Sequence, residues 1–345
     1  MRILVTGAAG LIGGEVSARL AAAGHHVTAL VRSNPDVLAN DGTQASVAEM
    51  VAGNLAQEDM GLEPATLDRL ARELDLILHC AALTRFDLEK DAYRATNIDG
   101  TARVLDLARR AGAGVLHVST AYVCGERSGP IGEDDPLPTE GFTNGYEASK
   151  AEAEALVRAS SVPFAIARPS IVVGDSRTGA IRQFDTIYAA FKLIAEGRVR
   201  HMPVSAGATL DFVPLDHVSA GIVALVEQFE AARGGAYHLV SGGPVSVEDF
   251  AAAIGSFAHF HEPVLADAAT FDPSGLPAME RRLYKRVAGL YAAYFQRDPR
   301  FDDTKMRAVT GLEPPTMDVA MLRKLIRYCV DAGFLRQPEH QRTSG

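Results

Sequence analysis

Ile3-Leu4-Val5-Thr6-Gly7-Ala8-Ala9-Gly10-Leu11-Ile12-Gly13, at the start of the chain, decides its fold class. The apolar run at residues 3–5 predicts a buried strand, and the apolar-periodic stretch at residues 11–20 predicts a helix. A glycine-rich turn between a strand and a helix is typical of a dinucleotide site. The N-terminus of such a helix offers free N–H groups and a partial positive charge to phosphate.

Each glycine of this turn has an expected structural reason. Gly7 allows the tight turn, Gly10 lets the backbone approach the phosphates, and Gly13 lets the helix pack closely on the strand. The expected cofactor contacts of the turn also include Ala9, Leu11 and Ile12. The turn thus predicts nucleotide binding at the first strand of the chain.

Apolar strand-like runs alternate with helical patterns in the first half of the chain, which is typical of a parallel sheet with crossover helices. Strands are expected at residues 2–5, 26–31, 48–52, 75–79, 114–118 and 163–167, and helices at 11–23, 64–73, 92–111 and 146–160. Farther on, helices are expected at 183–196, 216–231, 247–258, 279–296 and 318–333, with one more strand at 237–240.

These patterns predict an α/β protein with two parts. The first is a Rossmann-type, doubly wound parallel sheet that binds a dinucleotide, expected over residues 1–170 with a returning strand near 236–241. The second is a smaller, mostly helical C-terminal substrate cap, expected from residues 171–235 and 242–338.

Composition narrows the function classes. The chain has 345 residues, 47% of them hydrophobic, and a formal net charge of −9, which argues against a nucleic-acid partner. The three cysteines are scattered and suit a reducing compartment. No apolar run reaches membrane-spanning length, and the first strand begins too early for a signal peptide. From these features we expect a cytoplasmic protein. The histidines lack metal-ligand spacing, so we expect no metal.

The end of the second expected strand bears on the choice of cofactor. NAD enzymes usually place an acidic residue there for the ribose 2′-hydroxyl, whereas an arginine accommodates the 2′-phosphate of NADP. This chain has Arg32 followed by Ser33, so we expect NADP(H), with Ser33 as a second phosphate ligand. The alternative is a solvated arginine at the end of a strand.

A tyrosine and a lysine one helical turn apart form the second decisive pattern. Tyr146-Glu147-Ala148-Ser149-Lys150 places a phenol and an ammonium on one helical face. The same spacing recurs at Tyr188-Ala189-Ala190-Phe191-Lys192, but that segment falls in the expected cap, where aromatic residues at helical spacing usually form core. We therefore assign the acid–base pair to Tyr146 and Lys150.

The ordered series of motifs resembles the extended short-chain dehydrogenase/reductases over residues 3–240. It comprises the glycine turn, Gly53-Asn54-Leu55, His79-Cys80-Ala81-Ala82, Asn97-Ile98-Asp99-Gly100-Thr101, Ser119-Thr120-Ala121-Tyr122-Val123, the Tyr146–Lys150 segment and Arg168-Pro169-Ser170. The resemblance implies cofactor contacts by Asn54, Leu55, Ala81, Ala82, Lys150, Pro169 and Ile171. Asn54 departs from the aspartate usual in the family. Cys124 stands where epimerase-like members often carry tyrosine.

Catalytic roles follow from this resemblance together with residue chemistry. Tyr146 would give a proton to a carbonyl oxygen as hydride arrives, and Lys150 would stabilise the phenolate, lower the pKa of Tyr146 and hold the ribose hydroxyls. Thr120 would hydrogen-bond the carbonyl oxygen, with Ser119 as a supporting hydroxyl. Asn97 would tie a water relay to Lys150, by analogy with the family.

Several substrates stay open. Val118–Val123 and Gly174–Gly179 are similar to the fatty acyl reductases and thioester reductases. A 3-oxo lipid, such as a 3-oxo sphingoid base or ceramide, is favoured over an acyl thioester because no carrier domain is fused to this chain. A nucleotide-sugar epimerase or dehydratase and a non-catalytic NADP-binding scaffold are the remaining alternatives.

The expected helix 279–296 carries basic residues beside an aromatic stripe. It packs inward as part of the cap or lies on the inner face of a membrane as a peripheral contact. A monomer and a homodimer are both compatible with the sequence.

Overall fold

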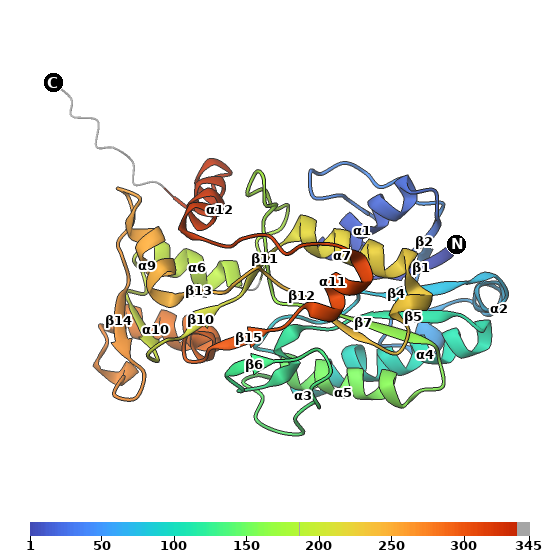
Figure 1. The fold of residues 1–345 in the computed structure, drawn as a ribbon, viewed down its shortest axis with the longest axis horizontal. Helices are drawn as coiled ribbons and strands as arrows, with labels where there is room; N and C mark the ends of the chain where they lie inside the picture. The colour runs from blue at the N-terminus through green and yellow to red at the C-terminus, as the bar shows by residue number, and fades with distance from the viewer. Residues whose placement is uncertain (186, 337–345) are drawn as a thin grey trace.

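The structure is a computed structural model that describes residues 1–185 and 187–336. Residue 186, within the expected helix 183–196, and residues 337 and 338, at the end of the expected cap, lie outside the described residues. A sheet with helices above and below it forms one part of the molecule, and helices and short strands form the other (Figure 1). Within the described ranges no helix is both long and apolar enough to cross a bilayer.

A seven-stranded parallel sheet forms the centre of the larger part. Its strands are β1 (Arg2–Thr6), β2 (His26–Val31), β3 (Glu49–Ala52), β4 (Leu76–His79), β5 (Gly114–Val118), β7 (Phe164–Pro169) and β12 (Ala236–Leu239). Their order is β12-β7-β5-β4-β1-β2-β3. The order turns outward in both directions from β1 and β4, as a doubly wound fold requires. The predicted strands and the predicted fold class are confirmed.

Helices cover both faces of this sheet (Figure 1). One face carries α1 (Leu11–Ala22), α7 (Leu215–Glu227), α8 (Phe229–Ala232) and α11 (Thr304–Thr310). The other carries α2 (Pro64–Glu73), α4 (Asp99–Ala111) and α5 (Gly145–Ala159), which share a second apolar core with the sheet.

Two features of this layer differ from the sequence prediction. The expected cap helix 216–231 forms α7 and α8, and Val218, Ile222 and Leu225 of α7 bury their side chains in the core beneath α1. The expected helix 92–111 is divided into α3 (Lys90–Tyr93), a π-helical turn (Arg94–Ile98) and α4. Periodicity predicts a helix but not the layer it joins, because both layers bury one apolar stripe.

The cap is built from the remaining segments. It contains α6 (Ile187–Ala195), α9 (Val247–Gly255), α10 (Ala278–Arg286), the 3₁₀ segment η5 (Ala288–Phe295) and α12 (Val319–Asp331). Short ladders pair β8 (Ile171–Val173) with β11 (Phe212–Pro214), β9 (His201–Val204) with β14 (Val264–Asp267), β10 (Thr209–Leu210) with β13 (Val245–Ser246), and β6 (Gly129–Ile131) with β15 (Pro299–Phe301). Short 3₁₀ turns lie at Glu58–Gly61, Ala121–Cys124 and Pro273–Gly275.

The expected helix 279–296 is interrupted. Its first part is α10, and the chain leaves helical geometry at Val287, where φ is −133°. Within η5, Tyr291, Tyr294 and Phe295 are buried in the cap core. Interior packing of the aromatic residues therefore accounts for this stripe.

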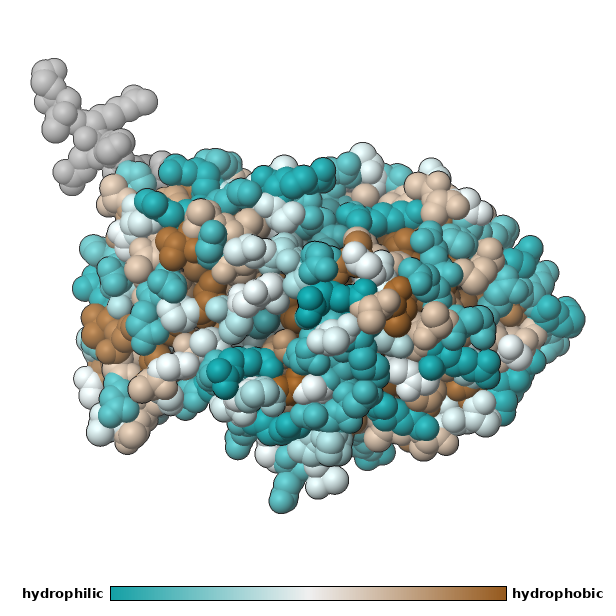
Figure 2. All heavy atoms as spheres, viewed as in Figure 1, coloured by the Kyte–Doolittle hydropathy of each residue, from teal (hydrophilic) through white to brown (hydrophobic). Residues whose placement is uncertain are grey.

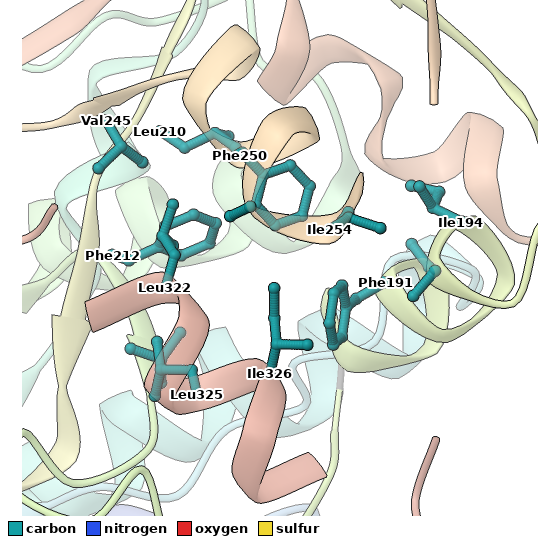
Figure 3. Close-up of a cluster of buried hydrophobic side chains, with 14 of the residues drawn as sticks. Phe191, Ile194, Leu210, Phe212, Val245, Phe250, Ile254, Leu322, Leu325 and Ile326 are labelled. Carbon is teal, nitrogen blue, oxygen red and sulfur yellow. The ribbon is translucent and has the colours of Figure 1, made fainter. Parts of the chain in front are cut away.

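Side chains from α6, α9 and α12 point toward one another in the cap core (Figure 3). The face of the molecule shown in Figure 2 is mostly hydrophilic, with hydrophobic residues scattered over it. The apolar side chains of the cap are thus largely buried between its helices.

Candidate active site

The glycine turn has the geometry of a phosphate cradle. Gly7 adopts φ +70°, and a Cβ atom there would lie 2.7 Å from the Cα of Ala81. A Cβ atom on Gly13 would lie 2.2 Å from the Gly7 carbonyl oxygen. The Gly10 N–H donates to that same carbonyl at 2.9 Å, and α1 begins at the next residue. The first N–H groups of α1 have no intrahelical acceptor, so they fit a dinucleotide pyrophosphate.

The residues predicted to bind the adenosine end of the cofactor differ in how free they are to contact it. Arg32 and Ser33 follow β2 and are exposed, and Arg32 has no ion pair or hydrogen bond within the described part of the chain. The Asn54 side chain accepts the Ala56 N–H at 3.1 Å within its own turn. Leu55 is buried against Gly100. Arg32 is therefore available to a 2′-phosphate, while the contacts of Asn54 and Leu55 with adenine stay predictions.

A cavity of about 350 Å³ opens above the glycine turn and extends under the cap. Of the predicted site residues it is lined by Gly7, Gly10, Leu11, Ile12, Gly13, Ala82, Ser119, Thr120, Tyr146, Lys150, Pro169 and Ile171. The structure thus brings the glycine turn, the hydroxyls after β5 and the Tyr/Lys pair together. Ala9, Arg32, Ser33, Asn54, Leu55, Ala81 and Asn97 do not line it.

Tyr146 stands in the first turn of α5. Asn144 caps this helix, because its side chain accepts the Glu147 N–H at 2.9 Å. Burial raises the pKa of Tyr146, the neighbouring Glu147 raises it further, and a hydrogen bond with Thr120 lowers it. The phenol is therefore protonated at neutral pH, as a proton donor must be. The predicted lowering of the Tyr146 pKa by Lys150 is not found, because burial outweighs the other influences on this pKa.

Two hydroxyls follow β5 beside Tyr146. Thr120 is buried and donates to the Pro169 carbonyl at 3.3 Å. Ser119 is buried as well, and its Oγ has no hydrogen-bond partner among the described residues although it lines the cavity. Ser119 and Thr120 therefore line the same cavity as Tyr146.

Lys150 lies one helical turn after Tyr146 in α5 and is buried. Its Nζ donates to the Val118 carbonyl at 2.7 Å and lies 3.3 Å from Nε2 of His117. Burial lowers the pKa of Lys150 to about 8 and keeps the pKa of His117 well below its ordinary value. The imidazole is therefore neutral, and its Nε2 accepts a hydrogen bond from the lysine.

The sequence interpretation did not include His117. It precedes Ser119 by two positions in and just after β5, and side chains two apart on a strand point to the same face. That alternation would have placed His117 toward α5 and Lys150. Nothing in the spacing of the motifs alone signals the contact.

The side chain of Asn97 makes hydrogen bonds to residues other than Lys150, with which a water relay was predicted. Its Oδ1 accepts the Leu83 N–H at 2.8 Å, and its Nδ2 donates to the Leu83 carbonyl at 3.1 Å and to Ser149 Oγ at 2.9 Å. These bonds fix the segment after β4 against α5. The relay stays a prediction, and the structure shows His117 in direct contact with Lys150.

A buried ion pair supports the helix turn that carries Tyr146. Arg297 donates to Glu147 at 2.7 Å, and the Tyr294 hydroxyl donates to the same carboxylate at 2.8 Å. The guanidinium also lies over the rings of Tyr122 and Tyr294, at 4.8 and 4.7 Å. These contacts join η5 of the cap to α5 of the Rossmann part.

The second Tyr/Lys pair has a different environment. The Tyr188 hydroxyl accepts the Gly174 N–H at 3.2 Å, and its ring is buried among aromatic side chains. Lys192 donates to the Phe334 carbonyl and lies 4.7 Å from the centre of the Phe334 ring. Lys192 therefore does not line the cavity, whereas Lys150 does.

Activity above neutral pH is expected to depend on Lys150. In the role predicted for this residue, its positive charge would favour the phenolate that remains after Tyr146 gives up a proton. Burial lowers the pKa of Lys150 to about 8. The ammonium is charged below that pH and loses its proton above it. We expect kcat/KM for carbonyl reduction to fall as pH rises through about 8, by about tenfold per pH unit. A pH–rate profile at saturating cofactor measures this, and a rate that stays constant well above that pH contradicts it.

A parallel Rossmann sheet with a Tyr/Lys pair over a glycine turn defines the class of extended short-chain dehydrogenase/reductases, in agreement with the resemblance found in the sequence. The model of the family described as "Male sterility protein" matches residues 5–222. The chain therefore belongs to this family, a branch of NAD(P)-binding oxidoreductases that includes fatty acyl and thioester reductases.

Three similar proteins illustrate the relationship. The aldehyde reductase lnaA of Aspergillus flavus is 25% identical over 95% of this chain and 36% of its own length. The 4-hydroxy-2-methyl-3-oxo-4-farnesyl-3,4-dihydroquinoline-1-oxide ketoreductase of Stigmatella aurantiaca is 31% identical over 72% of this chain and 71% of its own. The crystal structure of the terminal R domain of the myxalamid PKS-NRPS pathway has a TM-score of 0.81 and 28% identity, and covers 98% of this chain and 92% of that domain. The matched region spans 36%, 4% and 24% of the length of the first three curated relatives, so each of them is much longer than this chain.

Proposed function

We propose that this protein is an NADPH-dependent reductase of the carbonyl group of an apolar acyl or lipid substrate. One observation carries the proposal: the cavity above Tyr146 is walled mainly by aliphatic and aromatic side chains. Phe86, Tyr291 and Tyr294 are among them. Lys150 is the one basic side chain among the described lining residues, and it is buried. A nucleotide sugar would require cations for its diphosphate, so this lining favours an acyl chain.

The cofactor fits the glycine turn, the free N–H groups of α1 and the unpaired Arg32. NADPH, when bound, supplies hydride. Thr120 and Ser119 would hold the carbonyl oxygen, and Tyr146 would donate its proton to that oxygen. Lys150 would stabilise the phenolate, and the aromatic residues of η5 would exclude water from the reacting carbon.

Two forms of the substrate each have support. The ketoreductase relative supports a ketone, which would be reduced to an alcohol. The family branch supports an acyl thioester, which would accept hydride and a proton and yield an aldehyde and a free thiol. NADPH oxidation with a long-chain 3-oxo lipid and with a long-chain acyl thioester tests both. Release of thiol, measured with a thiol reagent, identifies the second. Cofactor binding without oxidation by either substrate would overturn the proposal and favour the scaffold alternative.

The choice of cofactor gives a separate prediction. Arg32→Ala removes the cation that follows β2, so we expect NADPH to bind about 10- to 150-fold more weakly and NADH to bind as before. The range corresponds to the roughly 1.5–3 kcal/mol that a hydrogen bond to a charged group contributes. Titration of both cofactors by calorimetry measures this. Arg233→Ala, at an exposed position beyond α8, is the matched control. Equal losses for NADPH and NADH would contradict the assignment of Arg32 to the 2′-phosphate.

A further inference from the structure

A second cavity lies in the cap beside the active-site cavity. Its volume is about 40 Å³, and its walls come from α6, α9, α12 and the β8/β11 ladder. Tyr188 and Ile187 line both cavities, so the two are separated by no more than these side chains. Phe191, Phe250, Leu322, Leu325 and Ile326 face this region in the cap core (Figure 3).

The chemistry of this second cavity is uniform. Its described lining residues are aliphatic or aromatic, apart from Cys329. Burial raises the pKa of the Cys329 thiol to about 12, so the thiol is neutral. A cavity without polar partners does not hold ordered water and takes hydrocarbon instead. Its volume exceeds the roughly 30 Å³ that one water molecule occupies in the liquid, which is comparable to a methyl or methylene group.

The partition between the cavities is fixed on one side. The Tyr188 hydroxyl accepts the Gly174 N–H at 3.2 Å, and its ring packs against Phe184 at 5.4 Å between ring centres. Ile187, the other shared residue, is half-buried and has no polar anchor. An alkyl chain that leaves the active-site cavity can therefore pass along Ile187 while Tyr188 keeps its position.

We propose that the cavity between α6, α9 and α12 binds the terminal methyl group of the substrate's alkyl chain, with Ile187 and Tyr188 at its entrance. This inference rests on the proposed reductase function and names the part of the substrate that the cap selects. The carbonyl group would lie at Tyr146, and the far end of the chain would lie against Cys329 and Ile326. The cap would then distinguish substrates by chain length.

A chain-length series tests this directly. We expect kcat/KM for saturated acyl substrates to rise about fourfold at the chain length whose last carbon fills the cavity, and not to rise with further carbons. Cys329→Leu adds two heavy atoms at the cavity wall and would fill the cavity, so the ratio of kcat/KM for long to short chains should fall about fourfold. Ile326→Ala should move the preferred length to longer chains. The control is Val330→Leu. Val330 follows Cys329 in α12 and does not line the cavity, so this variant should keep the wild-type ratio of kcat/KM for long to short chains.

A labelling experiment gives a readout that does not require turnover. The probe is a saturated fatty amide with a diazirine at its terminal carbon. On irradiation with the wild-type protein it should label peptides from α6, α9 or α12, and Cys329→Leu should reduce that labelling. Labelling elsewhere, or an unchanged chain-length ratio in a folded Cys329→Leu protein, overturns the inference and shows a packing gap only. Absence of reduction with every substrate would overturn the proposed function, while the labelling pattern would still decide the tail site.

Discussion

Tyr146→Phe is expected to lower kcat by about a hundredfold to ten-thousandfold, the range attributed to a positioned general acid. Phenylalanine keeps the ring, which stacks on Phe86 with 5.9 Å between ring centres, so the cavity retains its shape. The affinity for NADPH should be nearly unchanged, because the substitution leaves the glycine turn and Arg32, the expected phosphate-binding groups, as they are. Steady-state kinetics together with calorimetric titration of NADPH measure the two effects separately.

Tyr284→Phe is the matched control for this variant. It removes a phenol from α10, outside the active-site cavity, and should leave kcat at the wild-type value. Wild-type turnover by Tyr146→Phe would show that another group donates the proton. A parallel loss of NADPH binding would show that the substitution disturbs the cofactor site.

Arg297→Leu is expected to lower the free energy of unfolding by about 3–5 kcal/mol, because it leaves the Glu147 carboxylate buried without its cation. The Glu147 side chain is 0% exposed and that of Arg297 is 4% exposed, so solvent screens the pair little. The Tyr294 hydroxyl would remain as a donor to the carboxylate, without compensating its charge. Chemical denaturation with a two-state fit measures the loss.

A surface pair close by provides the control. Arg300 lies 3.5 Å from Asp298, and its side chain is 58% exposed. Arg300→Leu should change stability by no more than about 1 kcal/mol. The double variant Arg297→Leu, Glu147→Gln should recover part of the loss, because the unpaired charge is gone. Equal free energies of unfolding for Arg297→Leu and Arg300→Leu would contradict the role assigned to the buried pair.

Much of the Rossmann part could be predicted from the sequence. The strands β1 and β4 each contain a run of three apolar residues, at 3–5 and 76–78, and these runs are buried. A short continuous apolar run is typical of a parallel strand that is covered on both faces. The glycine turn carries its structural reason in residue type, because a side chain at Gly7 or Gly13 would collide with backbone. These local signals are sufficient for the fold class.

The parts that could not be predicted depend on contacts between distant segments. The pairing of β6 with β15 joins residues far apart in the chain, and neither strand has a strong local pattern. The break at Val287 lies within an apolar-periodic stretch that continues past it. The placement of α7 on the sheet follows from the position of β11 before it, which periodicity does not report.

The candidate site shows the same division. Tyr146, Thr120 and Lys150, which the resemblance groups as catalytic residues, line one cavity, and their roles stay predictions. The sequence did not predict the contact between Lys150 and His117. The two residues lie on different elements, α5 and β5, and only folding brings them together. The neighbouring hydrocarbon cavity was not anticipated either, since its walls combine α6, α9 and α12.

Hydride transfer to a carbonyl carbon is the central claim, and isotope transfer tests it most directly. The protein would be incubated with NADPH deuterated at both C4 positions and with a long-chain 3-oxo lipid or acyl thioester, and the product analysed by mass spectrometry. We expect one deuterium on the former carbonyl carbon for the wild-type protein, and a rate of incorporation that Tyr146→Phe lowers in step with kcat. A wild-type protein that binds NADPH but yields no deuterated alcohol or aldehyde from either substrate would contradict it.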